Sequence, residues 1–151
     1  MSMQARLDAC GLVIPEPAAA VGSYVPAVRD GDTVYTSGQL PMRDGQLMAS
    51  GLVGDDVSVE VAFDCARQAA LNALSAASTV CDLDEVTRVV KVTGYVASAK
   101  GFTAQPSVIN GASDVFLSLF DDVGRHAREA VGVVRLPLDA PVEVSVVFSL
   151  R

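Results

Sequence analysis

The sequence predicts an α+β domain in which two helices pack on one face of a β-sheet of about five or six strands. Half of the 151 residues are hydrophobic, which fits one domain with a buried core. Apolar residues recur at helical spacing in two segments and at strand spacing in the segments around them. The elements follow in the order strand–strand, helix, strand, helix, strand–strand. This order lacks the regular alternation of strands and helices in a doubly wound nucleotide-binding fold.

The first predicted elements are a short helix and a hairpin. One or two helical turns are expected over residues 3–10, and the prolines within residues 15–17 favour extended chain after them. Residues 24–28 and 33–37 are predicted strands because they are rich in β-branched and aromatic side chains. The intervening Asp-Gly-Asp sequence at residues 30–32 has the composition of a turn.

Residues 58–79 are predicted to form the main helix. Asp55, Asp56 and Ser58 are candidate N-terminal caps. The apolar stripe of this helix is mostly alanine, which allows a helix to lie close to a sheet: Ala62, Cys65, Ala66, Ala69, Ala70, Ala73, Leu74 and Ala77. The position of Cys65 on this stripe favours a buried core thiol over a reactive one.

The second half of the chain predicts three strands and one helix. The strands are expected at residues 86–96, 131–136 and 142–148, and the helix at residues 108–119. In the last strand every second residue is apolar, and Glu143 stands among the residues between them. This alternation predicts one face covered by the helices and one open face.

Composition and charge exclude several classes of function. There are 11 Lys and Arg residues and 18 Asp and Glu residues, and the net charge of −7 argues against a nucleic-acid partner. Three cysteines and the single histidine, His126, supply neither a disulfide framework nor a zinc site, so no metal is expected. No segment has the pattern of a membrane span or a signal peptide, which predicts a cytoplasmic protein. The mean hydropathy of +0.38 favours burial of apolar surface in an oligomer.

A few polar residues in apolar strand contexts are candidates for chemistry. Glu143 is either part of a solvated strand face or a carboxylate with raised proton affinity that takes a proton from water. Arg128 is either a surface charge or a clamp for a substrate carboxylate. Gly38 either ends a strand in an ordinary turn or lets a ligand approach the chain closely. His126 fits a surface or interface residue better than a general base.

Several separated segments, in one collinear order, resemble the RidA family of reactive-intermediate deaminases. This family is also called the YjgF family and carries an L-PSP endoribonuclease label. The resemblance covers residues 20–151, so residues 1–19 are interpreted as an N-terminal extension, typical of a longer subgroup. The matching segments are Gly22-Ser23-Tyr24, Thr36-Ser37-Gly38-Gln39-Leu40-Pro41, Val108-Ile109-Asn110, Ala127-Arg128, Arg135-Leu136-Pro137 and Val142-Glu143-Val144.

The resemblance implies a fold, an assembly and an activity. The implied subunit is chorismate-mutase-like, with a mixed sheet, and three subunits form a homotrimer with clefts between them. The implied activity is hydrolysis of enamines and imines, such as 2-aminoacrylate, to 2-keto acids and ammonia. The family needs no metal or organic cofactor.

The resemblance also assigns roles to single residues. Arg128 matches the arginine that holds the substrate carboxylate, and Glu143 matches the glutamate that orders or activates water. The spacing of these two residues suits two neighbouring strands. The matching substrate-binding positions are Tyr24, Ser37, Gly38, Asn110 and Ala130. Ala130 stands where many members have cysteine, which removes thiol reactivity but leaves a backbone role.

Two other functions remain open on the sequence. The same cleft in a non-catalytic protein would bind a small carboxylate such as a keto acid, because anchoring a carboxylate needs only the arginine. The historical label of the family points to a ribonuclease or translation inhibitor, which the net charge of −7 disfavours.

Overall fold

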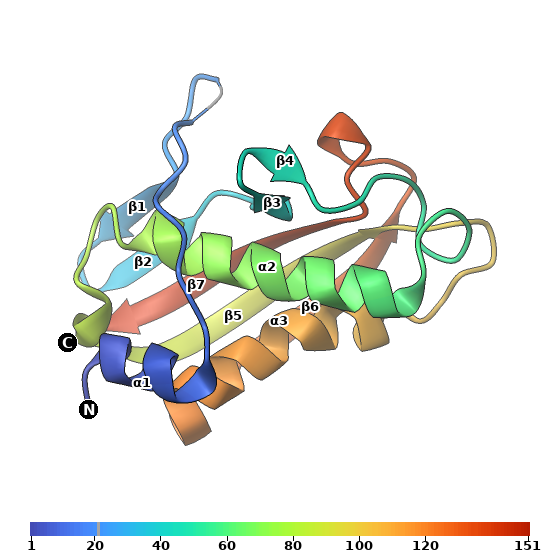
Figure 1. The fold of residues 1–151 in the computed structure, drawn as a ribbon. Helices are drawn as coiled ribbons and strands as arrows, with labels where there is room; N and C mark the ends of the chain where they lie inside the picture. The colour runs from blue at the N-terminus through green and yellow to red at the C-terminus, as the bar shows by residue number, and fades with distance from the viewer. Residues whose placement is uncertain (21) are drawn as a thin grey trace.

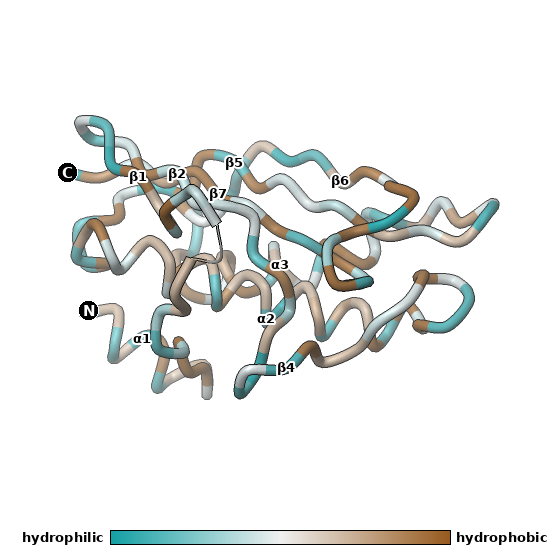
Figure 2. Tube along the Cα trace, turned by 90° about the horizontal axis from the view of Figure 1, so that it is seen from above, coloured by the Kyte–Doolittle hydropathy of each residue, from teal (hydrophilic) through white to brown (hydrophobic). Residues whose placement is uncertain are grey.

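The structure, a computed structural model, describes residues 1–20 and 22–151 and consists of a sheet layer and a helix layer (Figure 1). Figure 2 shows the helices gathered on one side of the sheet. The helices are α1 (Met3–Cys10), α2 (Val59–Ala77) and α3 (Gln105–Phe120). The strands are β1 (Ala27–Asp30), β2 (Thr33–Thr36), β3 (Met42–Arg43), β4 (Gln46–Leu47), β5 (Val86–Ala97), β6 (Ala127–Val133) and β7 (Val142–Leu150).

The main sheet has five strands in the order β1-β2-β7-β5-β6. Strands β5 and β6 are parallel, while the other neighbouring pairs are antiparallel, so the sheet is mixed. Strands β3 and β4 form a separate two-stranded ribbon. The predicted α+β class is confirmed, with a mixed sheet that α2 and α3 cover on one face.

Local sequence signals account for several of these elements. Helix α2 begins where Ser58 accepts a hydrogen bond from the backbone N–H of Val61 at 3.2 Å, as expected of an N-cap. The turn between β1 and β2 places Gly31 at φ 59°, a conformation that favours glycine. Short helix α1 packs through Met3 and Leu7, which are both buried.

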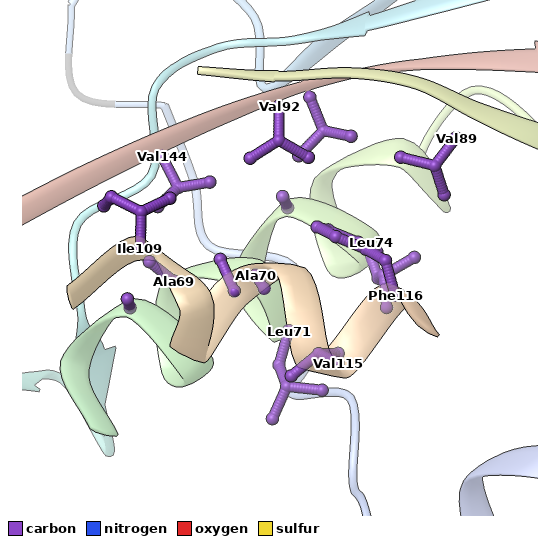
Figure 3. Packing of buried hydrophobic residues seen from close by; sticks show 14 of the residues in the cluster. Ala69, Ala70, Leu71, Leu74, Val89, Val92, Ile109, Val115, Phe116 and Val144 are labelled. Atoms are coloured by element: carbon purple, nitrogen blue, oxygen red, sulfur yellow. The ribbon is translucent and has the colours of Figure 1, made fainter. Parts of the chain in front are cut away.

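The core lies between the two helices and the sheet (Figure 3). Alanine side chains of α2 and the larger Ile109 and Phe116 of α3 meet valines from β5 and β7. At Gly111 an added Cβ would collide with the backbone carbonyl of Phe63, so glycine there permits the close approach of α3 to α2. Cys65 is fully buried, which confirms the core interpretation, and burial raises the pKa of its thiol to about 11.

Two predicted strands have wrong boundaries for reasons outside their own sequence. The strand expected at residues 131–136 occupies Ala127–Val133, because its parallel register with β5 ends at the pair Ala97–Val133. The strand expected at residues 24–28 begins only at Ala27. Pro26 has no N–H to donate to the sheet, although its carbonyl accepts a 2.8 Å hydrogen bond from the backbone of Ser37.

The predicted helix at residues 108–119 is present and starts earlier, at Gln105. None of the helices in the described part of the chain is both long and apolar enough to cross a membrane.

Candidate functional site

Strand β7 separates a covered face of the sheet from an open one. Val142, Val144 and Val146 are buried against the helices, and the residues between them are half-buried on the opposite face. This is the alternation predicted from the sequence, and it places Glu143 on the open face. In the register of the sheet, Glu143 lies opposite Tyr95 of β5.

Four of the predicted site residues lie at the end of the sheet where β7 begins, and we call Tyr24, Ser37, Gly38 and Glu143 the Glu143 cluster. A Cβ on Gly38 would lie 2.8 Å from the carboxyl carbon of Glu143, so only a hydrogen fits between them. The hydroxyl of Ser37 donates to the carbonyl of Val25 at 2.6 Å, which fixes the chain next to this contact. Burial raises the pKa of the Glu143 carboxyl above its ordinary value.

A cavity of about 500 Å³ borders this cluster. Tyr24 and Gly38 line it together with the extended N-terminal segment, the segment after β2 and part of α2. Tyr24 is half-exposed, at 53%. The side chain of Asn72 closes one wall by donating to the carbonyls of Leu40 and Met42 at 2.9 and 3.0 Å.

The other predicted site residues, Asn110, Arg128 and Ala130, gather where β6 meets α3, and together with Ser113 we call them the Arg128 cluster. Arg128 lies opposite the buried Val92 of β5, so its side chain leaves the sheet on the helix face. Its Nη1 donates to Oδ1 of Asn110 at 2.7 Å and to Oγ of Ser113 at 3.2 Å. Ala130 packs against the core on the same face.

The two contacts of Arg128 decide what its guanidinium can bind. The two acceptors, Oδ1 of Asn110 and Oγ of Ser113, both bond to Nη1, and both belong to neutral side chains. Among residues 1–20 and 22–151, the Nε and Nη2 groups have no hydrogen-bond partner. These two groups form one edge of the guanidinium, which matches the two oxygens of a carboxylate.

The two clusters of one chain do not form a single site. The prediction that Arg128 and Glu143 lie on neighbouring strands is wrong, because β5 runs between β6 and β7. The two residues are therefore two strands apart, about 10 Å across the sheet, and are also offset by three residues, about another 10 Å, along the strands. They also leave the sheet on opposite faces, since Arg128 pairs with the helix-facing Val92 and Glu143 with Tyr95. One small molecule cannot contact both side chains of the same chain.

Ser113 is a member of the Arg128 cluster that the sequence reasoning missed. It follows Asn110 by one helical turn, so the two side chains lie on the same face of α3. Ser113 could have been predicted from its position three residues after the predicted Asn110 on the same helix.

His126 precedes β6 and is half-buried, in contact with the Arg128 cluster. Within the described part of the chain, no three His, Cys, Asp or Glu side chains group closely enough to hold a metal ion.

Comparison with known proteins gives consistent matches over almost the whole chain. A family model described as "YjgF/chorismate mutase-like, putative endoribonuclease" matches residues 4–150. Protein TCP17 of Trypanosoma cruzi is 43% identical over 149 residues, covering 97% of this chain and 93% of that protein. The 2-iminobutanoate/2-iminopropanoate deaminase of Salmonella typhimurium is 32% identical over 133 residues, covering 88% of this chain and 91% of the deaminase.

Among solved structures, one described as a putative endoribonuclease from Shewanella oneidensis matches with a TM-score of 0.94 and 32% identity. The match covers 99% of this chain and 100% of that one. The similarity therefore includes α1 and the extended segment after it.

Proposed function

The chain belongs to the YjgF/RidA family, and on this premise we propose that it hydrolyses reactive imines and enamines of 2-keto acids to the keto acid and ammonia. The observation that carries the proposal is the free edge of the Arg128 guanidinium. Asn110 and Ser113 hold the opposite corner, Nη1, which leaves Nε and Nη2 for the carboxylate of the substrate.

The complete site forms between two copies of the chain in a homotrimer. The Arg128 cluster comes from one copy and the Glu143 cluster from the next, in a head-to-tail arrangement that closes into a ring. Support comes from the opposite faces of Arg128 and Glu143 within one chain. The open face of the sheet also exposes apolar side chains, with Val28 at 51%, Tyr35 at 50% and Val131 at 41% exposure.

The chemistry follows from the charges of these groups. Arg128 holds the carboxylate and so fixes the neighbouring imine carbon, which is electrophilic when its nitrogen is protonated. Glu143 orders a water molecule and accepts its proton as the oxygen adds to that carbon. The proton then passes to the nitrogen, the carbon–nitrogen bond breaks, and the carbonyl of the keto acid forms. Overall, a protonated imine and water give a keto acid and an ammonium ion.

The electrostatic setting suits Glu143 as the base. Burial raises the proton affinity of the carboxyl, which favours proton uptake from water. The guanidinium of Arg128 from the neighbouring copy would favour the ionised carboxylate before the reaction. Tyr24 and Gly38 of the same cluster also line the neighbouring cavity of about 500 Å³.

The test measures ammonia and keto-acid release from imines generated in the assay, from 2-aminoacrylate to bulkier examples. We expect turnover by the wild type and its loss in Arg128→Ala. Arg125→Ala is the matched control, because the Arg125 side chain is 76% exposed and its guanidinium pairs with the surface residue Asp122. Wild-type turnover in Arg128→Ala would contradict the proposal.

The same proteins separate the alternatives. Tight binding of a keto acid to the wild type without turnover would favour a carboxylate-binding protein. Cleavage of RNA by purified wild type, lost in Arg128→Ala, would favour a ribonuclease.

A further inference from the structure

A chain of hydrogen bonds runs from the backbone before β6 to the guanidinium of Arg128. Nδ1 of His126 lies 2.6 Å from the carbonyl oxygen of Gly124, and Nε2 lies 2.9 Å from Oγ of Ser113. The same Oγ accepts from Nη1 of Arg128 at 3.2 Å. His126 and Ser113 therefore join Asn110 in determining where Nη1 lies.

The direction of each bond in this chain follows from what its atoms can donate. The Gly124 carbonyl can only accept, so Nδ1 of His126 carries the ring proton. In the neutral ring Nε2 is then an acceptor, and the hydroxyl of Ser113 donates to it. The lone pairs of Ser113 remain for the N–H of Arg128. Every donor in the chain thus has an acceptor when the imidazole is neutral.

The surroundings of His126 keep the ring neutral and fixed. Burial is the main cause that lowers its pKa, the positive charge of Arg128 adds to it, and the bond to Gly124 opposes it. Phe116 of α3 packs edge-on against the ring, with the centroids 6.0 Å apart.

The charged side chains near the His126 ring come from several elements. Arg125 precedes the ring in the chain, and Arg88 of β5 reaches the Arg125 carbonyl at 3.5 Å. Asp122 pairs with Arg125 at 3.5 Å and is 98% exposed.

We propose that His126 and Ser113 are positioning residues that hold Nη1 of Arg128, so that its Nε and Nη2 edge faces the substrate carboxylate. The inference rests on the proposed function of Arg128 and extends it to two residues that act on the substrate through Arg128. It predicts a specific kinetic effect. Carboxylate binding weakens when the chain is broken, while proton transfer at Glu143 continues.

The expected size follows from the loss of one hydrogen bond of ordinary net strength, because Asn110 still accepts from Nη1 at 2.7 Å. Ser113→Ala raises KM about 3- to 10-fold and changes kcat less than about twofold. His126→Phe gives a similar rise, because phenylalanine retains the packing on Phe116 but has no ring nitrogen. His126→Gln restores much of the binding, since the glutamine amide reaches the position of Nε2.

The experiment measures kcat, KM and the calorimetric affinity for the product keto acid in these three variants. Ser118→Ala is the matched control, because Ser118 lies on the same helix and its hydroxyl donates to the backbone carbonyl of Asp114, at 2.8 Å. Thermal melting of each variant establishes that it is folded, and the two His126 variants test the chain even if Ser113→Ala does not fold.

Three results would overturn the inference. The first is an unchanged KM and affinity in both Ser113→Ala and His126→Phe, with Arg128→Ala inactive. The second is a His126→Gln protein no better than His126→Phe. The third is wild-type affinity of Arg128→Ala for the keto acid. This result would contradict the proposed function as well, whereas the first two would contradict only the positioning role.

Discussion

Adding one methyl group at Gly38 is expected to reduce kcat about 100-fold, because it displaces the carboxyl of Glu143. The new Cβ would lie 2.8 Å from the Glu143 carboxyl carbon and 3.1 Å from Oε1. Ordinary carbon–carbon contacts lie near 3.5–4.0 Å, so the carboxyl must move by about 1 Å. Gly38 does not adopt a positive φ, so alanine adds no backbone strain and the effect is steric.

The assay compares Gly38→Ala with Gly132→Ala in steady-state deamination of an imine. Gly132 is a matched control, because its Cβ would lie 2.8 Å from Nε2 of Gln105, a flexible side chain outside both clusters. We expect nearly wild-type kcat for Gly132→Ala. Full activity of Gly38→Ala, or equal losses in both variants, would refute the role given to the Glu143 carboxyl.

The remaining predictions concern the core and the titrating groups. Phe116→Ala should lower the free energy of unfolding by about 3–5 kcal/mol in urea titrations, since the side chain is fully buried; a loss under about 1 kcal/mol would contradict the packing. Cys65, with a pKa of about 11, should be about one part in 1,000 thiolate at pH 8, so mass spectrometry should find iodoacetamide on Cys10 well before Cys65. Because the pKa of His126 is lowered from 6.5, the folded state binds fewer protons than the unfolded one, and stability falls as the pH drops below about 6.5. Between pH 7 and pH 5 the melting temperature of the wild type should therefore fall more than that of His126→Phe. Equal changes in the two melting temperatures would contradict this pH dependence.

The fold was predictable from the sequence where local signals decide the structure. Ser58 begins α2 because its hydroxyl binds an N–H of the first turn, and the alanine stripe of that helix indicates close packing. The alternation in β7 likewise assigned Glu143 to the open face. The ends of β6 were not predictable in this way, because its partner β5 determines how far the pairing extends.

The separation of Arg128 from Glu143 was equally beyond local pattern. Strand order depends on contacts between distant parts of the chain, and nothing near either residue indicates that β5 inserts between their strands. The contacts of Arg128 with Asn110 and Ser113 depend in the same way on where α3 crosses the sheet. The sequence could nominate these residues singly but could not group them into two clusters.

Mixing two inactive variants tests the shared site most directly. Arg128→Ala retains a complete Glu143 cluster, and Glu143→Gln retains a complete Arg128 cluster. If the subunits of the two are exchanged at equal amounts, about one quarter of the interfaces combine both intact clusters. A site shared between two copies predicts that the mixture regains about a quarter of wild-type activity, although each variant alone is inactive. A mixture that stays inactive after verified subunit exchange would contradict a site built from two copies.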